Sequence, residues 1–146
     1  MSLTKFLLGV VILFVILMFF IFIYSHTLPR ADTAATKAIY SKTFKYISEE
    51  IQGCALGKTT IMDGNLTCSE LSAANVVAAT AKTLTVDRNY YDVRNNAVRI
   101  STSSTKDKDA GYINLSASGS DVVVKSCHTK PCSDEDNRIS KTVEIK

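Results

Sequence analysis

Residues 35–54 read "ATKAIYSKTFKYISEEIQGC", in which apolar side chains recur every three or four positions. This spacing places them on one face of an α-helix, and the charged side chains fall on the opposite face. Gly53 is typical of a helix C-terminus. The pattern predicts an amphipathic helix over residues 31–53 whose apolar stripe needs a covering surface. The stripe consists of Ala35, Ile39, Tyr40, Thr43, Phe44, Ile47, Ile51 and Cys54.

The chain before this helix is strongly apolar. Residues 1–24 read "MSLTKFLLGVVILFVILMFFIFIY", without a charge from Phe6 to Tyr24. As a helix, that stretch is about 28 Å long, close to the thickness of a bilayer's hydrocarbon core. A secretory signal has a shorter apolar stretch and a small-residue cleavage site, which Ile23 to His26 does not offer. We therefore expect a membrane helix over residues 1–30, usable as an anchor or as a polymerisation handle.

After residue 54 the spacing of apolar residues no longer follows one long helix. Residues 54–84 contain a turn-rich loop and a short helix, for which we expect Ser69 as N-cap. Over residues 96–146 the apolar period becomes two, which predicts four short strands separated by turns. The expected fold class is α+β: a long N-terminal helix, with a membrane half and an amphipathic half, packed on a four-stranded antiparallel sheet in one head domain, residues 31–146. The inward pairs are Val98 and Ile100, Ile113 and Leu115, Val122 and Val124, and Val143 and Ile145.

Four cysteines occur, all after the apolar segment: Cys54, Cys68, Cys127 and Cys132. An even number behind a membrane segment indicates disulfides in an oxidising compartment. Three pairings are possible, and the short separations favour Cys54 with Cys68 and Cys127 with Cys132. A zinc site is disfavoured because there is no Cys-x-x-Cys and only His128 lies nearby.

Catalytic signals are weak. His26 lies at the expected membrane boundary, and His128 is expected to be a solvated loop residue. The acidic runs "DKDAG" and "SDEDN" lack the 12-residue calcium loop with its closing glutamate. A net charge of +3 gives no reason to expect nucleic-acid binding. The sequence therefore predicts a protein that is not an enzyme and has no cofactor, metal or catalytic residue.

The chain resembles the type IV pilins and their pseudopilin relatives. The resemblance lies in the start of the chain, Met1 to Leu7, in Pro29 followed by a striped helix, and in a late cysteine pair bounding a short loop. It implies a structural subunit of an extracellular helical filament, drawn from an inner-membrane pool, with copies of itself as partners and a possible surface receptor. The residues implied in polymerisation are Met1, Lys5, Phe6, Leu7 and Val15, and the loop is His128, Thr129, Lys130 and Pro131.

Lys5 departs from the family, which has a glutamate at the matching position. Met1 can be an ordinary initiator with Lys5 as a cytoplasmic anchor charge. The chain can instead be a minor pilin or pseudopilin, or Lys5 can meet carbonyls freed at a helix break. The alternative function is a single-span periplasmic or surface protein that binds or senses without polymerising. For the filament, we expect Lys106–Asp109 and His128–Pro131 to be exposed at sheet ends, away from the membrane helix.

Overall fold

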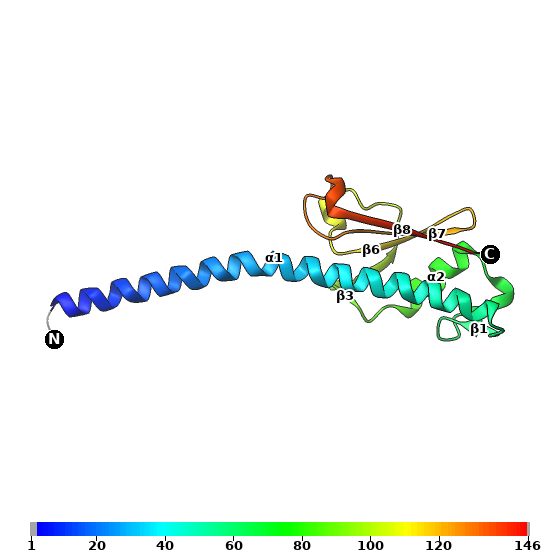
Figure 1. Cartoon of the computed structure of the whole chain (residues 1–146), viewed down its shortest axis with the longest axis horizontal. Coiled ribbons are helices and arrows are strands. Elements are labelled where there is room, and N and C mark those ends of the chain that lie inside the picture. Colours follow the sequence, from blue (N-terminus) through cyan, green and yellow to red (C-terminus); the bar gives the residue numbers. More distant parts are fainter. Residues whose placement is uncertain (1–2, 146) are drawn as a thin grey trace. The chain divides into compact units, whose positions relative to one another are not determined.

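The computed structural model describes the backbone of residues 3–145 and the side chains of residues 7–24 and 31–145. The chain divides into two compact units, one ending at Ala31 and one, the head, beginning at Asp32. Helix α1, Leu3–Ala55, supplies all the described secondary structure of the first unit and the first helix of the head (Figure 1). The helix ends two residues beyond the expected end at Gly53.

The head part of α1 buries its predicted stripe. Ile39, Tyr40, Thr43 and Ile47 are buried, and Phe44, Ile51 and Cys54 pack against the same core from partly buried positions. Full burial of a side chain such as Ile47 contributes about 1.5–3 kcal/mol. The Tyr40 hydroxyl donates a hydrogen bond to the Val124 carbonyl at 3.3 Å, and burial raises the pKa of Tyr40 to about 12. The predicted amphipathic helix is therefore confirmed.

Between α1 and the main sheet the chain forms two small hairpins around a second helix. Strands β1, Thr60–Ile61, and β2, Leu66–Thr67, pair antiparallel, as do β3, Arg88–Asn89, and β4, Asp92–Asn96. The 3-10 turn η1, Cys68–Glu70, precedes α2, Ala73–Thr83. The expected N-cap at Ser69 was wrong: Ser69 lies in η1, and the Ser72 hydroxyl accepts the capping bond from the Asn75 N–H at 3.3 Å.

The main sheet has four strands in the order β5-β6-β7-β8. The β6–β7 and β7–β8 pairs are antiparallel, but β5 runs parallel to β6, so the expected all-antiparallel sheet was wrong for one pair. The parallel pairing is possible because two neighbouring parallel strands need a crossover connection of about a dozen residues. Residues 101–112, between β5 and β6, supply that connection. The bounds are β5 Val98–Ile100, β6 Ile113–Ser118, β7 Asp121–Cys127 and β8 Arg138–Glu144, with 3-10 turns η2 Asp107–Asp109 and η3 Glu135–Asn137.

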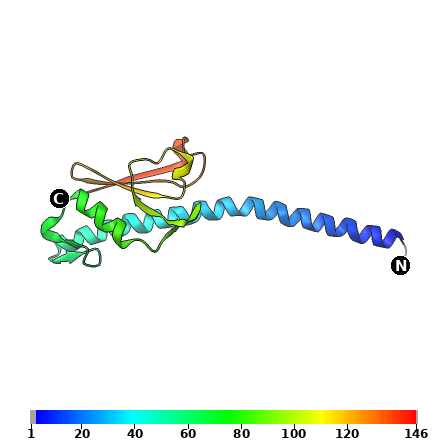
Figure 2. The same cartoon turned by 180° about the vertical axis from the view of Figure 1, so that it is seen from behind.

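One face of this sheet forms the core. Figures 1 and 2 show the head part of α1 and α2 on the same side of the sheet. Val98, Ile113, Leu115, Val122 and Val124 are buried there, as predicted. Val143 and Ile145 pack partly buried at the margin. Ile100 is 60% exposed, so its expected burial was wrong: it is the last residue of a three-residue strand at the sheet edge, beyond the helices' cover.

Candidate functional site

The apolar segment is the first candidate. Leu7–Tyr24 is a helical stretch of 18 residues with a mean hydropathy of 3.2, long and apolar enough to span a membrane. Its described side chains are all exposed, Leu7 and Val15 among them. Of the other predicted polymerisation residues, Met1 lies outside the described residues, and so do the side chains of Lys5 and Phe6. Helices that are apolar on every side are typical of membrane spans and of the buried cores of large proteins.

The Cys54–Cys68 disulfide ties the last turn of α1 to the start of η1. Its Cα atoms lie 5.5 Å apart, and both cysteines are partly exposed. Closing a loop of about 15 residues in the unfolded chain is worth about 3 kcal/mol in the chain-entropy account. The bridge therefore fixes the loop that carries β1 and β2 against the end of the helix.

The Cys127–Cys132 disulfide is fully buried and forms a second, smaller core with Ala110 and the partly buried Tyr91. The Gly111 N–H donates a hydrogen bond to the Cys127 carbonyl at 2.9 Å. At Gly111 φ is +79°, and a Cβ there would collide with the Asn89 side chain, so only glycine fits. The short loop is thus packed into the head rather than projecting from it.

His128 was expected to be solvated, and the structure corrects this: it is buried. Burial, then the nearby charge of Lys37, lowers the pKa of His128, against the opposing effect of a hydrogen bond to the Asp136 backbone. Its Nδ1 has no partner among the described residues. Thr129 is half-buried, while Lys130 and Pro131 are exposed as predicted. Only the tip of the loop therefore faces solvent.

Within the head, the His128–Pro131 loop lies near the first turn of the head part of α1. The Tyr91 hydroxyl donates to the His128 carbonyl at 3.0 Å and lies 3.4 Å from the Thr33 hydroxyl. Thr33 is in the first turn of α1 within the head. The loop therefore packs near the start of the head part of α1, because Tyr91 bridges the His128 carbonyl and the Thr33 hydroxyl.

The turn Lys106–Asp109 is only partly the exposed surface that we expected. Lys106 and Lys108 are exposed, but Asp109 is buried. Burial alone would raise the pKa of the Asp109 carboxyl. Hydrogen bonds from the Ser103 hydroxyl, the Lys106 N–H and the Arg99 guanidinium, with the charge of Arg99, hold that pKa below its usual range. Sequence reasoning missed this ion pair, whose only signal was an arginine inside an otherwise apolar strand.

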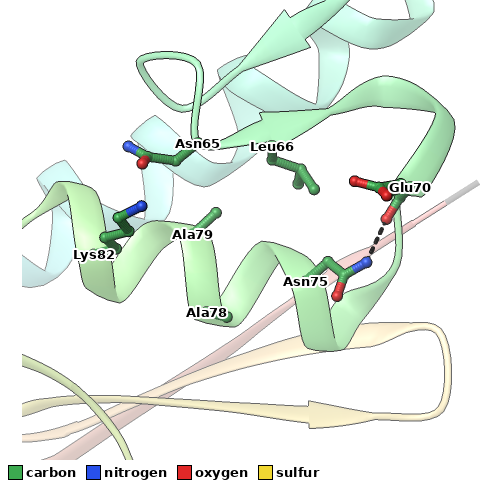
Figure 3. Close-up of a pocket in the computed structure, with 7 residues that line it drawn as sticks. All are labelled: Asn65, Leu66, Glu70, Asn75, Ala78, Ala79 and Lys82. Atoms are coloured by element: carbon green, nitrogen blue, oxygen red, sulfur yellow. Dashed lines mark hydrogen bonds between the residues drawn. The ribbon is translucent and has the colours of Figure 1, made fainter.

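A shallow hollow of about 310 Å³ lies between β2 and α2. Figure 3 shows Glu70 and Lys82 at its two ends and the Asn75 side chain turned to the Glu70 backbone, to which it donates at 2.7 Å. Asn65 donates to the Met62 carbonyl and the Thr83 hydroxyl, both at 3.0 Å. The bond from Asn65 to Thr83 holds the β1–β2 hairpin to α2.

Among the residues that the structure describes, no group of three or more His, Cys, Asp or Glu side chains is arranged to hold a metal ion. The candidate sites that the described residues offer are the apolar segment, the exposed loop tip and the grooves of the head. No protein-family model, curated protein or solved structure matches this chain.

Proposed function

We propose that this chain is the structural subunit of a type IV pilus-like helical filament and polymerises through its apolar N-terminal helix. The subunit is held in the inner membrane as a precursor pool and is then incorporated into a filament on the cell surface. One observation carries the proposal: Leu7–Tyr24 is helical and exposes every described side chain, while the same helix α1 continues into the head as a structural element.

The physical argument concerns the surroundings that the apolar segment can accept. A bundle of such segments from many copies is as apolar as lipid, so transfer from the bilayer to a filament core changes their solvation little. Packing between copies then favours assembly, and a heterologous contact that does not close into a ring produces a helical fibre. The exposed Lys130 and Pro131 are candidate contacts for a surface receptor.

Electron microscopy of the full chain and of Val15→Asp tests the proposal. An aspartate there would be buried without a partner in every subunit, a penalty of several kcal/mol, so we expect filaments from the full chain and none from the variant. Val15→Leu is the matched control and should assemble normally.

Two results would count against the proposal. One is a full chain that remains dispersed in detergent under every assembly condition, the behaviour of a single-span binding or sensor protein. The other is filament formation by residues 32–146 alone, which would remove the apolar segment from assembly.

A further inference from the structure

The sequence contains two triplets of the form Asn-x-Ser/Thr without a central proline, the motif at which N-linked glycans are attached. The asparagine of a usable triplet lies at the protein surface, because the attached sugar is bulky and hydrated. The surroundings of the two asparagines therefore determine which triplet can carry a glycan in the folded protein. The triplets are Asn65-Leu66-Thr67 and Asn114-Leu115-Ser116.

The second triplet lies in the main sheet. Asn114 belongs to β6, an interior strand, and its side chain is fully buried. Its Oδ1 accepts a hydrogen bond from Arg99 Nε at 2.7 Å. A sugar on this side chain would need space that the close-packed head fills with its own atoms. The folded head therefore excludes a glycan at Asn114, whether sugars are added before or after folding.

The first triplet lies on a turn. Residues 62–65 connect β1 to β2, and Asn65 is the last of them and exposed. Thr67 is exposed as well, while Leu66 between the two is buried in the main core. The leucine thus anchors the hairpin, and the asparagine and the threonine on either side of it face solvent. This is the surface position that an acceptor triplet requires.

The hydrogen bonds of Asn65 are compatible with a sugar on its Nδ2. This nitrogen carries two hydrogens, and it donates to the Met62 carbonyl and the Thr83 hydroxyl, both at 3.0 Å. Attachment of a sugar replaces one hydrogen, so one of these two bonds remains. The Thr83 hydroxyl also lies 3.2 Å from the Met62 carbonyl oxygen, so the hairpin keeps a link to α2 in either case.

The hollow between β2 and α2 offers room for the first sugars. It measures about 310 Å³, and Asn65 is one of its lining residues. Figure 3 shows Asn65 at the same end of the hollow as Lys82. Glu70, Asn75 and Lys82 supply polar groups that can hydrogen-bond to sugar hydroxyls. A sugar tethered at this rim has a high effective concentration in the hollow, so weak contacts suffice to hold it there.

We infer that Asn65 is a site of N-linked glycosylation and that the first sugars cover the hollow between β2 and α2. The donor is a sugar chain carried on a lipid diphosphate. The bond from Nδ2 to the sugar C1 forms as the C1–O bond to the diphosphate breaks. The diphosphate leaves with the electron pair of that bond, and one Nδ2 proton passes to a base of the transferase.

The two disulfides support this inference, because they indicate that the head folds in an oxidising compartment. Secreted and surface-exposed domains are the ones in which such triplets receive glycans. The inference requires export of the head but does not depend on filament formation.

Mass spectrometry of the full chain, purified from the cells that make it, tests the attachment. After reduction and digestion with trypsin, we expect a mass increment of whole sugar residues on peptide 59–82, located on Asn65 by fragmentation that preserves the sugar linkage. Peptide 109–125, which contains Asn114, is the internal control and should have its unmodified mass. Peptide 59–82 found only at its unmodified mass, or a sugar on Asn114 or on a hydroxyl group instead, would overturn the inference.

A matched pair of variants at Thr67 separates the motif from effects on folding. Thr67→Ala keeps Asn65 but destroys the triplet, so the mass increment should be lost completely. Thr67→Ser changes the same exposed position and keeps the triplet, so the increment should remain. An increment that persists on Asn65 in Thr67→Ala would show that the triplet is not what directs the modification.

Amine labelling tests the position of the sugars. Lys82 is exposed at the hollow and should react more slowly in the glycosylated chain than in Asn65→Gln. Lys141, exposed on β8 and outside the hollow, is the reference and should react equally in both proteins. Equal labelling of Lys82 in the two proteins would overturn the covering of the hollow and leave the attachment at Asn65 standing.

Discussion

Arg99 Nη2 lies 2.7 Å from Asp109 Oδ1, and this ion pair joins the edge strand β5 to the crossover that leads into β6. The carboxylate is 2% exposed, and its other oxygen accepts from the Ser103 hydroxyl at 2.7 Å. The guanidinium also lies 3.7 Å from the centre of the Tyr112 ring. The pair therefore fixes the connection that makes β5 parallel to β6.

Loss of the Asp109 carboxylate should destabilise the head strongly. In Asp109→Ala the Arg99 charge loses its buried partner, and removing one side of such a pair costs about 3 kcal/mol. Lys108→Ala, an exposed change in the same turn, should stay within about 0.5 kcal/mol. Urea unfolding of residues 32–146 measures both. Equal stability of the two variants would contradict a structural role for the pair.

Ser72→Ala should destabilise α2 by about 1 kcal/mol, because the helix loses the hydroxyl that accepts from the Asn75 N–H. Ser69→Ala is the matched control: its hydroxyl lies exposed, 3.5 Å from that of Thr67, so little change is expected. Thermal unfolding of the two variants compares them. A larger loss at Ser69 would favour the helix start that the sequence predicted.

The two disulfides should open in a fixed order under native conditions. A reducing agent reaches the partly exposed Cys54–Cys68 bridge directly, whereas Cys127 and Cys132 are fully buried. Alkylation during mild reduction, followed by peptide mapping, should label Cys54 and Cys68 first. Earlier labelling of Cys127 or Cys132 would show that the short loop opens more readily than its packing indicates.

Acidification should weaken the head through His128, the only histidine in residues 32–146. Because its folded-state pKa is lowered, the unfolded chain takes up the proton first, starting near the unperturbed value of about 6.5. Stability is therefore lost as pH falls from about 6.5 toward the folded-state pKa. His128→Gln should show a smaller loss between pH 7.5 and 5 in urea unfolding, and Lys37→Gln an intermediate one. An identical loss in all three proteins would refute the assignment.

Lys130 should react with amine-directed reagents on intact filaments, since its side chain is exposed at the tip of the Cys127–Cys132 loop. Lys42, which is paired with Asp87 at 2.8 Å, should react more slowly in the same sample. Mass spectrometry gives both extents of labelling. Complete protection of Lys130 would mean that the loop faces another subunit instead of the surroundings.

Much of the architecture could be predicted because it depends on spacing within one segment. The helical period over residues 35–54 is local, so it identified Ile39, Tyr40 and Ile47 as buried. The unbroken apolar run likewise identified Leu7–Tyr24 as a helix long enough to span a membrane. Alternation likewise identified the inward faces of β6 and β7. Such patterns can be read without knowing which segment packs against them, because they depend only on the hydrophobicity of each residue and the repeat of the helix or strand.

Other features depend on contacts between distant segments, which no local pattern carries. The direction of β5 depends on how residues 101–112 cross over, and Asp109 is buried there only because Arg99 arrives from the strand. His128 is polar and lies in a loop, yet it is buried because Tyr91 ties that loop to Thr33. Burial of such polar groups depends on partners that only folding brings within reach.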